Sequence, residues 1–170
     1  MDTHLDHEIE NSQNKPCARS AKPYKNMGGT GVGILVRSRT PARPVHPPEE
    51  MCRARRLWET GRWQHVIATY GSGARALHIF NVYGYNHAHS QTQRHALNEW
   101  LLRETLAEAA ALGLAAVAVT DRNTLAGMVR AHGAAKAAGI QLIVGVRLDL
   151  TDAPSLLCLP TNRAAYGRLS

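Results

Sequence analysis

The feature that most restricts the possible folds is a strand, a helix and a second strand joined by short, glycine-marked connections. Apolar residues dominate 114–120 and 140–145, and the segment 124–138 between them has helical spacing and ends at Gly139. Glycine commonly follows the last helical residue, because it adopts the left-handed backbone conformation without strain. A helix between two strands returns the chain to the same end of the sheet. The pattern therefore predicts a βαβ unit with two buried, parallel strands, and an α/β fold after residue 90.

Two further elements are predicted upstream of this unit. Apolar residues recur at helical spacing in the segment that ends before Gly113; they are Leu97, Leu101, Leu102, Leu106 and Ala109. Such spacing is typical of an α-helix. The runs 63–70 and 75–83 are apolar, β-branched and aromatic, and Gly71-Ser72-Gly73 separates them. Two runs of this kind around a glycine-rich joint predict an antiparallel hairpin.

The remaining segments have less regular patterns. Residues 1–27 mix charges without apolar periodicity and predict a disordered leader. The run 33–36 follows a glycine cluster and predicts a short strand, whereas 40–62 is rich in proline and arginine and predicts an irregular connection. Near the end, 156–159 predicts another strand, and Thr161 is placed to open a last helix.

The charge of the chain favours anionic partners. It carries 20 Lys and Arg residues against 13 Asp and Glu residues, a net charge of +7, which makes nucleic acid the first partner to consider. A coding sequence biased towards Arg and Ala would give the same balance. We expect weak DNA binding without sequence preference, with phosphate contacts from Arg53, Arg55 and Arg56. A solvated loop is the alternative interpretation of this arginine cluster.

Cysteine usage and hydropathy bear on the cellular compartment. The three cysteines, Cys17, Cys52 and Cys158, are odd in number and far apart. This argues against a disulfide framework or a structural zinc site, and for a reducing compartment. The N-terminus lacks a secretory pattern, and no apolar run approaches the roughly 18 residues of a membrane-spanning helix. We therefore expect a cytoplasmic protein without a membrane partner.

Residues 109–170 resemble an interior segment of the PHP domain (polymerase and histidinol phosphatase) at the N-terminus of bacterial error-prone DNA polymerase III alpha-type subunits. The resemblance rests on the runs TDRNTLAG, RAH, AAKAAGI and GVRLDL, and it extends to residue 87 if an HxH motif there belongs to it. It implies a partial, β/α-barrel-like fold of PHP type for 87–170. A β-rich segment, 28–86, with the predicted hairpin would precede this part.

The resemblance implies a metal site. PHP domains open with an HxH motif after their first strand, and His87 and His89 stand at the corresponding place, with His89 32 residues before Asp121 of the second motif. Two imidazoles and a carboxylate are ligands that suit Zn²⁺, Mn²⁺ or Mg²⁺. The alternative is a pair of solvated loop histidines.

Two positions of the family's metal motifs carry arginine in this chain. The second motif, TDH in active PHP domains, ends in Arg122, and Arg147 replaces the glutamate of the third motif. A guanidinium group stays charged, does not ligate a metal and repels a divalent ion. We therefore expect no working metal cluster. An ion pair, Arg122–Asp149 or Arg147–Asp121, would take its place.

Residues 28–113 have a second resemblance, to the endonuclease/exonuclease/phosphatase superfamily. It rests on the strand pattern and the run NVY, and the superfamily's D-x-N motif would fall on Asp121 and Asn123. It implies a Mg²⁺-dependent phosphodiesterase or nuclease in which Asp121 orients a water nucleophile and Asn123 holds the phosphate. The early acidic metal ligand and the late Asp-His pair of that superfamily have no counterpart here.

The leading hypothesis is a PHP-domain fragment of an error-prone DNA polymerase, acting in translesion DNA synthesis, DNA replication and DNA repair. It would be non-catalytic by itself, since the carboxylates of a polymerase palm have no candidate positions, and whether the chain is an enzyme stays open. Its implied partners are DNA and the missing polymerase domains or other replication and repair proteins. The alternatives are the phosphodiesterase and a non-functional fusion of the two. The PHP hypothesis expects 75–83 to run parallel to and beside 114–120, whereas a two-sheet sandwich with Asn81 near Asp121 and Asn123 would favour the phosphodiesterase.

Overall fold

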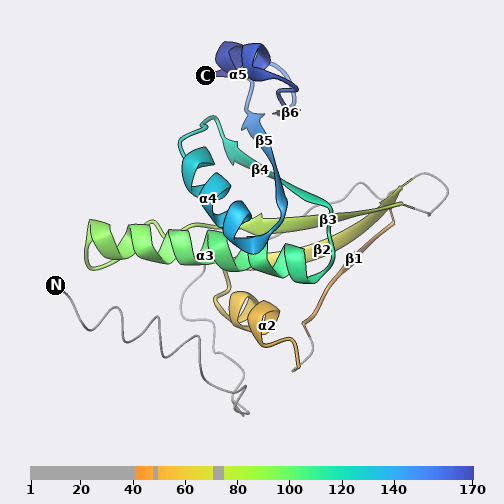
Figure 1. The fold of residues 1–170 in the computed structure, drawn as a ribbon, viewed down its shortest axis with the longest axis vertical. Helices are drawn as coiled ribbons and strands as arrows, with labels where there is room; N and C mark the ends of the chain where they lie inside the picture. Colours follow the sequence, from red (N-terminus) through yellow and green to blue (C-terminus); the bar gives the residue numbers. More distant parts are fainter. Residues whose placement is uncertain (1–40, 48–49, 71–74) are drawn as a thin grey trace. The chain divides into compact units, whose positions relative to one another are not determined.

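The computed structural model describes residues 41–47, 50–70 and 75–170. It has a mixed α/β fold in two compact units, Met1–Leu101 and Leu102–Ser170, and each unit contains one three-stranded sheet (Figure 1). Within the described residues neither sheet closes into a barrel. No helix in this part of the chain is both long and apolar enough to cross a membrane. The predicted leader and the short strand 33–36 lie outside the described residues.

The sheet of the first unit is antiparallel. Its strands are β1 (Ala42–Pro44), β2 (Trp63–Tyr70) and β3 (Arg75–Val82), in the order β1-β2-β3. Strand β2 pairs with β3 over its whole length, from Trp63 opposite Val82 to Tyr70 opposite Arg75. The predicted hairpin is therefore confirmed, with its second strand ending one residue early.

The first unit also contains a helix, α2 (Cys52–Glu59), inside the segment that the sequence predicted to be irregular. This prediction was wrong, because the prolines that break regular structure all precede the helix. Ala54 and Leu57 lie three residues apart on one face of α2 and are buried. They join Trp63 and Leu101 in the core of the unit, with Phe80, Tyr85 and Trp100 packed against this cluster.

Helix α3 (Gln91–Ala111) follows the hairpin, and the boundary between the two units falls within it. At its start the Ser90 hydroxyl accepts a hydrogen bond from the Gln93 amide at 3.1 Å, an N-terminal cap. At its end Gly113 has φ of 71° and donates its N–H to the Ala110 carbonyl. The predicted helix and its glycine cap are confirmed.

The second unit contains the predicted βαβ arrangement. Strands β4 (Ala116–Arg122) and β5 (Gln141–Leu148) are parallel, and α4 (Met128–Ala138) connects them and contacts β5 (Figure 1). Gly139 ends α4 with φ of 70°, and the Ile140 amide donates to the Ala135 carbonyl, as in a Schellman cap. The prediction of buried strands was wrong for β4, whose residues are half-buried or exposed, and in β5 it holds only for Gly145 and Val146.

Three boundaries in the second unit differ from prediction. Helix α4 begins four residues late, at Met128, because the Thr124 hydroxyl accepts from the Ala126 amide and closes a turn before it. Strand β6 (Leu156–Cys158), which pairs antiparallel with β5, ends one residue before the predicted end. Helix α5 (Arg163–Leu169) is capped by the Asn162 side chain, which accepts from the Ala165 amide at 2.8 Å. Asn162, and not Thr161, therefore opens the last helix.

The hairpin and the βαβ unit do not share a sheet, as the PHP hypothesis would require. Strand β3 belongs to the sheet β1-β2-β3, and β4 belongs to the sheet β4-β5-β6. Among the described strands, β3 therefore pairs with β2 alone and forms no ladder with β4. Local antiparallel pairing accounts for β3, since a four-residue joint brings it back along β2.

Candidate functional site

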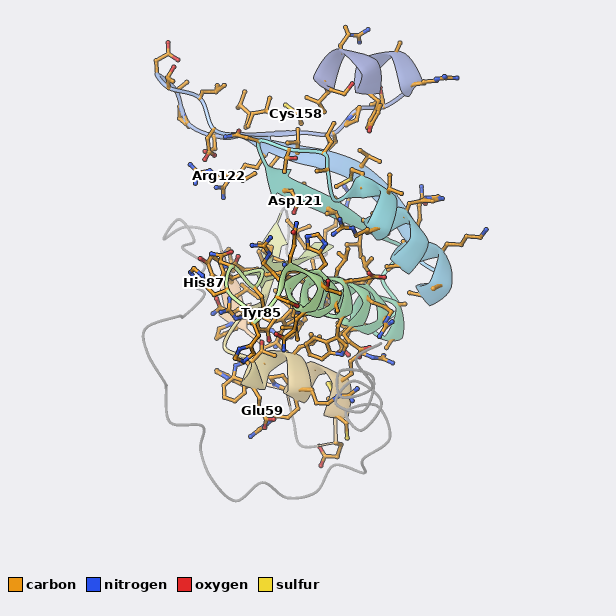
Figure 2. The ribbon with its side chains drawn as sticks, turned by 90° about the vertical axis from the view of Figure 1, so that its left-hand side faces the viewer. Glu59, Tyr85, His87, Asp121, Arg122 and Cys158 are labelled. Carbon is orange, nitrogen blue, oxygen red and sulfur yellow. The ribbon has the colours of Figure 1, made fainter. Side chains whose placement is uncertain are left out.

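The carboxyl ends of β4 and β5 bring together the charged residues that the sequence singled out in the second unit. Successive side chains of a strand point to opposite faces of its sheet, so Asp121 and Arg122 at the end of β4 lie on opposite faces (Figure 2). Arg122 is the register partner of Arg147 on β5, and these two share a face. Asp121 instead is opposite the buried Val146.

One carboxylate bridges the two arginines. Arg122 Nε contacts Asp149 Oδ2, and Arg147 Nε donates to Asp149 Oδ1 at 3.1 Å. The arginine side chains are 69% and 47% exposed, whereas that of Asp149 is 21% exposed. The predicted Arg122–Asp149 ion pair is confirmed, and Arg147 joins the same carboxylate instead of pairing with Asp121. We refer to Arg122, Asp149 and Arg147 as the charge triad.

Two polar residues fix the position of Asp149. The Ser155 hydroxyl donates to Asp149 Oδ1 at 2.7 Å, and the Asp149 amide donates to Asn123 Oδ1 at 2.8 Å. Asn123 has φ of 52°, a left-handed conformation that asparagine tolerates better than most residues, and its amide donates to the Arg147 carbonyl. Asn123 therefore ties the end of β4 to the end of β5.

These contacts favour the charged form of Asp149. The hydrogen bond from Ser155 is the largest cause and lowers the pKa of Asp149. Desolvation, the second largest, raises it, and the charges of Arg122 and Arg147 lower it further, so the net shift is downward. The side chain therefore stays a carboxylate to lower pH than an ordinary aspartate.

Asp121 has a different environment. Burial raises its pKa above the ordinary aspartate value. Its carboxylate lies against Gly127, which precedes α4: a Cβ atom at this glycine would stand 2.6 Å from Asp121 Oδ2. The lack of a side chain at Gly127 therefore makes room for the Asp121 carboxylate on the α4 face of the sheet.

His87 and His89 lie in the first unit, in the loop between β3 and α3, and both are exposed. His87 is labelled in Figure 2. The loop is anchored near its start, where Asn98 Oδ1 accepts from the Tyr85 amide at 2.6 Å and Asn98 Nδ2 donates to the Tyr85 carbonyl at 3.2 Å. It is anchored near its end by the His89 amide, which donates to Gln93 Oε1 at 2.9 Å. Metal ligation by His87, His89 and Asp121 stays a prediction.

The charge triad does not fit the metal that the PHP resemblance implies. A metal at the ends of β4 and β5 would need ligands where Arg122 and Arg147 stand, and the nearby Asp149 has both oxygens engaged. Over the described ranges, no group of three or more His, Cys, Asp or Glu side chains is arranged to hold a metal ion. We therefore derive no chemistry from a metal at this edge.

The arginines expected to contact phosphate belong to α2 and not to a loop. Arg55 Nε donates to Glu59 Oε1 at 2.9 Å, and its guanidinium lies 5.2 Å from the centre of the Trp58 ring. Arg53, Arg55 and Arg56 all take part in further contacts within the protein. Their contact with nucleic acid stays a prediction.

Sequence reasoning missed Ser155 and the structural role of Asn123. Ser155 follows Pro154 in a polar turn before β6, and a serine there has no distinctive spacing to Asp149. Asn123 was considered only as a ligand of phosphate. An asparagine directly after a strand end, where the left-handed conformation is common, was the available signal.

Comparison with known proteins assigns the second half of the chain to a protein family. The PHP domain family matches residues 86–170. A 68-residue segment is 57% identical to error-prone DNA polymerase 2 of Agrobacterium fabrum, and covers 40% of this chain and 6% of that protein. A 63-residue segment is 59% identical to the error-prone DNA polymerase of Caulobacter vibrioides, and covers 36% of this chain and 6% of that protein.

These matches are local. The chain spans only a small part of the length of the curated relatives it matches. No solved structure has a significant match to the chain. The family match covers 86–170, which is half of the 170 residues and includes α3, the βαβ unit and the charge triad. This protein belongs to the PHP domain family.

Proposed function

We propose that the chain is a non-catalytic PHP domain portion in which the charge triad stands where active members hold metal ligands. The observation that carries this proposal is the contact of Asp149 with both Arg122 and Arg147 at the carboxyl ends of β4 and β5. Ligands of α/β proteins commonly bind at this end of a parallel sheet. For the complete domain we propose the β/α-barrel-like fold of the family.

The arrangement opposes metal-dependent hydrolysis in two ways. A divalent ion next to two guanidinium groups is repelled by both, and the nearby Asp149 carboxylate is already engaged by both arginines. The nearby Asn123 uses its side-chain oxygen for the Asp149 amide, so it is less suited to the phosphate-holding role in a D-x-N motif. We therefore favour the PHP interpretation over the phosphodiesterase alternative.

The triad would instead act as a structural clasp. Exposed ion pairs contribute only about 0–1 kcal/mol each to stability. The main effect of the triad would therefore be to position the segments that it connects. Asp149, Ser155 and Asn123 connect the end of β4, the end of β5 and the turn before β6. The clasp would hold these three segments in the geometry that a metal centre provides in active members.

The names of the relatives support a role in DNA synthesis. Error-prone DNA polymerases of Agrobacterium fabrum and Caulobacter vibrioides contain the matching segment. We propose that this chain serves as a scaffolding or regulatory part in translesion synthesis and repair, together with polymerase domains. Its charge of +7 supports weak, salt-sensitive contact with DNA.

The first experiment tests for catalysis by the full chain. Purified protein is assayed for hydrolysis of bis-p-nitrophenyl phosphate with Mn²⁺, Mg²⁺ or Zn²⁺, and for extension of a primed DNA template. We expect both rates to equal the blank. Metal-dependent hydrolysis that is abolished by Asp121→Asn would contradict the non-catalytic proposal and favour a phosphoesterase.

The second experiment tests the scaffolding role. Residues 86–170 replace the corresponding part of the PHP domain in the Caulobacter vibrioides relative, and primer extension by the chimera is compared with that by the parent. We expect the chimera to retain extension, and a chimera with Asp149→Asn to lose most of it because the clasp is broken. Loss of extension in the unaltered chimera, with the protein folded, would contradict this role.

A further inference from the structure

We propose that Arg62, Tyr83 and Tyr85 form a binding site for single-stranded nucleic acid at the open end of the β2–β3 hairpin. We refer to these three residues as the stacking site. They precede residue 86 and so lie outside the part of the chain that matches the PHP domain family. The inference therefore goes beyond the proposed function, which rests on the charge triad of the second unit.

The arrangement of the planar groups is the first observation. Arg62 and Tyr83 stand opposite each other just beyond the pair Trp63–Val82, and the Tyr83 amide donates to the Arg62 carbonyl at 2.8 Å. The central carbon of the Arg62 guanidinium lies 5.4 Å from the centre of the Tyr83 ring and 4.3 Å from that of Tyr85. One cation thus contacts two aromatic rings, an attraction that keeps the three groups close together.

Hydrogen bonds fix these groups before any ligand binds. Arg62 Nη1 donates to the Gly84 carbonyl at 2.9 Å, and Asn86 Nδ2 donates to the Tyr83 hydroxyl at 2.7 Å. Tyr85 packs against the core of the first unit. A ring and a guanidinium that are already held in place lose little conformational freedom when a ligand binds.

Exposure and charge leave the site open to a ligand. Tyr83 is 46% exposed, although Arg62 lies against its ring and Asn86 at its hydroxyl. A large part of the ring surface is therefore accessible to a second planar group. In the part of the chain that the structure describes, no carboxylate forms an ion pair with Arg62, so no salt bridge offsets its positive charge.

The chemistry of the site selects the ligand. A nucleotide carries a planar base beside a phosphate, and the site presents an aromatic ring beside a guanidinium. Bases of every kind stack on aromatic side chains, and arginine pairs with phosphate oxygens. The bases of a duplex stack on one another and do not reach such a ring. A cationic ligand, which aromatic rings also bind, would be repelled by Arg62.

The experiment measures binding of a short, fluorescein-labelled oligothymidylate to the full chain by fluorescence anisotropy at several salt concentrations. Tyr83→Ala should weaken binding at least fivefold, by about 1 kcal/mol or more, and leave the salt dependence unchanged, since a stacked ring contacts no phosphate. Arg62→Gln should weaken binding and reduce its salt dependence. Tyr166→Ala, which removes an exposed tyrosine of α5, should change the affinity less than twofold.

Two further measurements separate stacking from a loss of fold. Tyr83→Phe keeps the ring and loses only the hydroxyl, so its affinity should stay within about twofold of the wild type, because the ring supplies the stacking. In the wild type, the ring-proton NMR signals of Tyr83 should move upfield when the oligothymidylate is added, because a stacked base shields them. A duplex of the same length should not move them.

Two results would overturn the stacking site. One is an unchanged affinity for the oligothymidylate in folded Tyr83→Ala. The other is the absence of the upfield shift in the wild type at saturating oligothymidylate. A proline-rich peptide that moves these signals, where the oligothymidylate does not, would assign the rings to a protein partner instead. Each of these results leaves the clasp and the absence of hydrolysis untouched, since those are tested by the activity assays and the chimera.

Discussion

Arg122 and Arg147 stand side by side on parallel strands, and a single carboxylate, Asp149, holds both. In sequence this aspartate is two residues from one arginine and 27 from the other. Under the proposed function, two arginines and one carboxylate stand at positions that the resemblance assigns to metal ligands. They would keep the ends of β4 and β5 together without a metal.

The first expected outcome concerns Asp149. Its pKa in the folded protein is lowered from 3.8, so its contribution to stability is present above pH 3.8 and is lost as the pH falls through the folded value. Ser155→Ala removes the largest cause and should raise the pKa of Asp149, as measured by carboxyl ¹³C NMR. Ser170→Ala should leave it unchanged, and equal values in all three proteins would refute the assigned cause.

Two glycines of the α4 region should respond to alanine in opposite ways. Gly127→Ala places a Cβ 2.6 Å from Asp121 Oδ2, so the carboxylate must move towards solvent and its raised pKa should fall. We expect a loss of about 1 kcal/mol of unfolding free energy. Gly133 lies inside α4, and a Cβ atom there would meet no atom within 4 Å. Gly133→Ala should therefore raise the unfolding free energy by about 0.5–1 kcal/mol. Urea unfolding followed by circular dichroism measures both, and destabilisation by Gly133→Ala would contradict this packing.

His65 should make the first unit sensitive to acid. It is 3% exposed, and its Nε2 lies 3.0 Å from His78 Nδ1. Burial first, then the charges of His78 and Arg43, lower its pKa from 6.5 to about 4. Between these values the unfolded chain binds more protons, so unfolding free energy should fall as the pH falls from 6.5 towards 4.

Tryptophan fluorescence measures this effect, because all three tryptophans of the chain lie in the first unit. His65→Phe keeps an aromatic ring for stacking on Phe80 and should flatten the pH dependence. His95→Gln, on the exposed surface of α3, should leave the pH dependence unchanged. An unchanged pH dependence in His65→Phe would show that another group titrates in this window.

The regular elements of the fold were largely predictable from sequence, since local patterns determine them. The glycine joints, the apolar runs and the helical spacing before Gly113 predicted the hairpin, α3 and the βαβ unit. Helix α2 was missed because its arginines and the preceding prolines masked the burial signal of Ala54 and Leu57. That β3 and β4 belong to different sheets depends on strand pairing across the fold, which the pattern of a single strand does not encode.

The ion pair of the candidate site was predictable from sequence, and the residues that position it were not. Strand alternation places Arg147 and Asp149 on one face, and this led to the expected Arg122–Asp149 pair. The contributions of Ser155 and Asn123 depend on the turn after β5 and on a left-handed backbone, and the Asn123–Asp149 contact joins residues 26 apart. Geometry of this kind follows from the folded chain and not from motif spacing.

Metal binding by a double variant, with both arginines of the triad replaced by metal-ligating residues, tests the central claim most directly. Arg122→His with Arg147→Glu removes two repelling charges and adds an imidazole and a carboxylate next to Asp149, whose oxygens are then free of both arginines. Calorimetric titration with Mn²⁺ and Zn²⁺ should detect no binding at this edge in the wild type and one metal ion per chain in the folded double variant. Tight binding of one ion by the wild type, lost on Asp149→Asn, would contradict the claim that the triad takes the place of a metal centre.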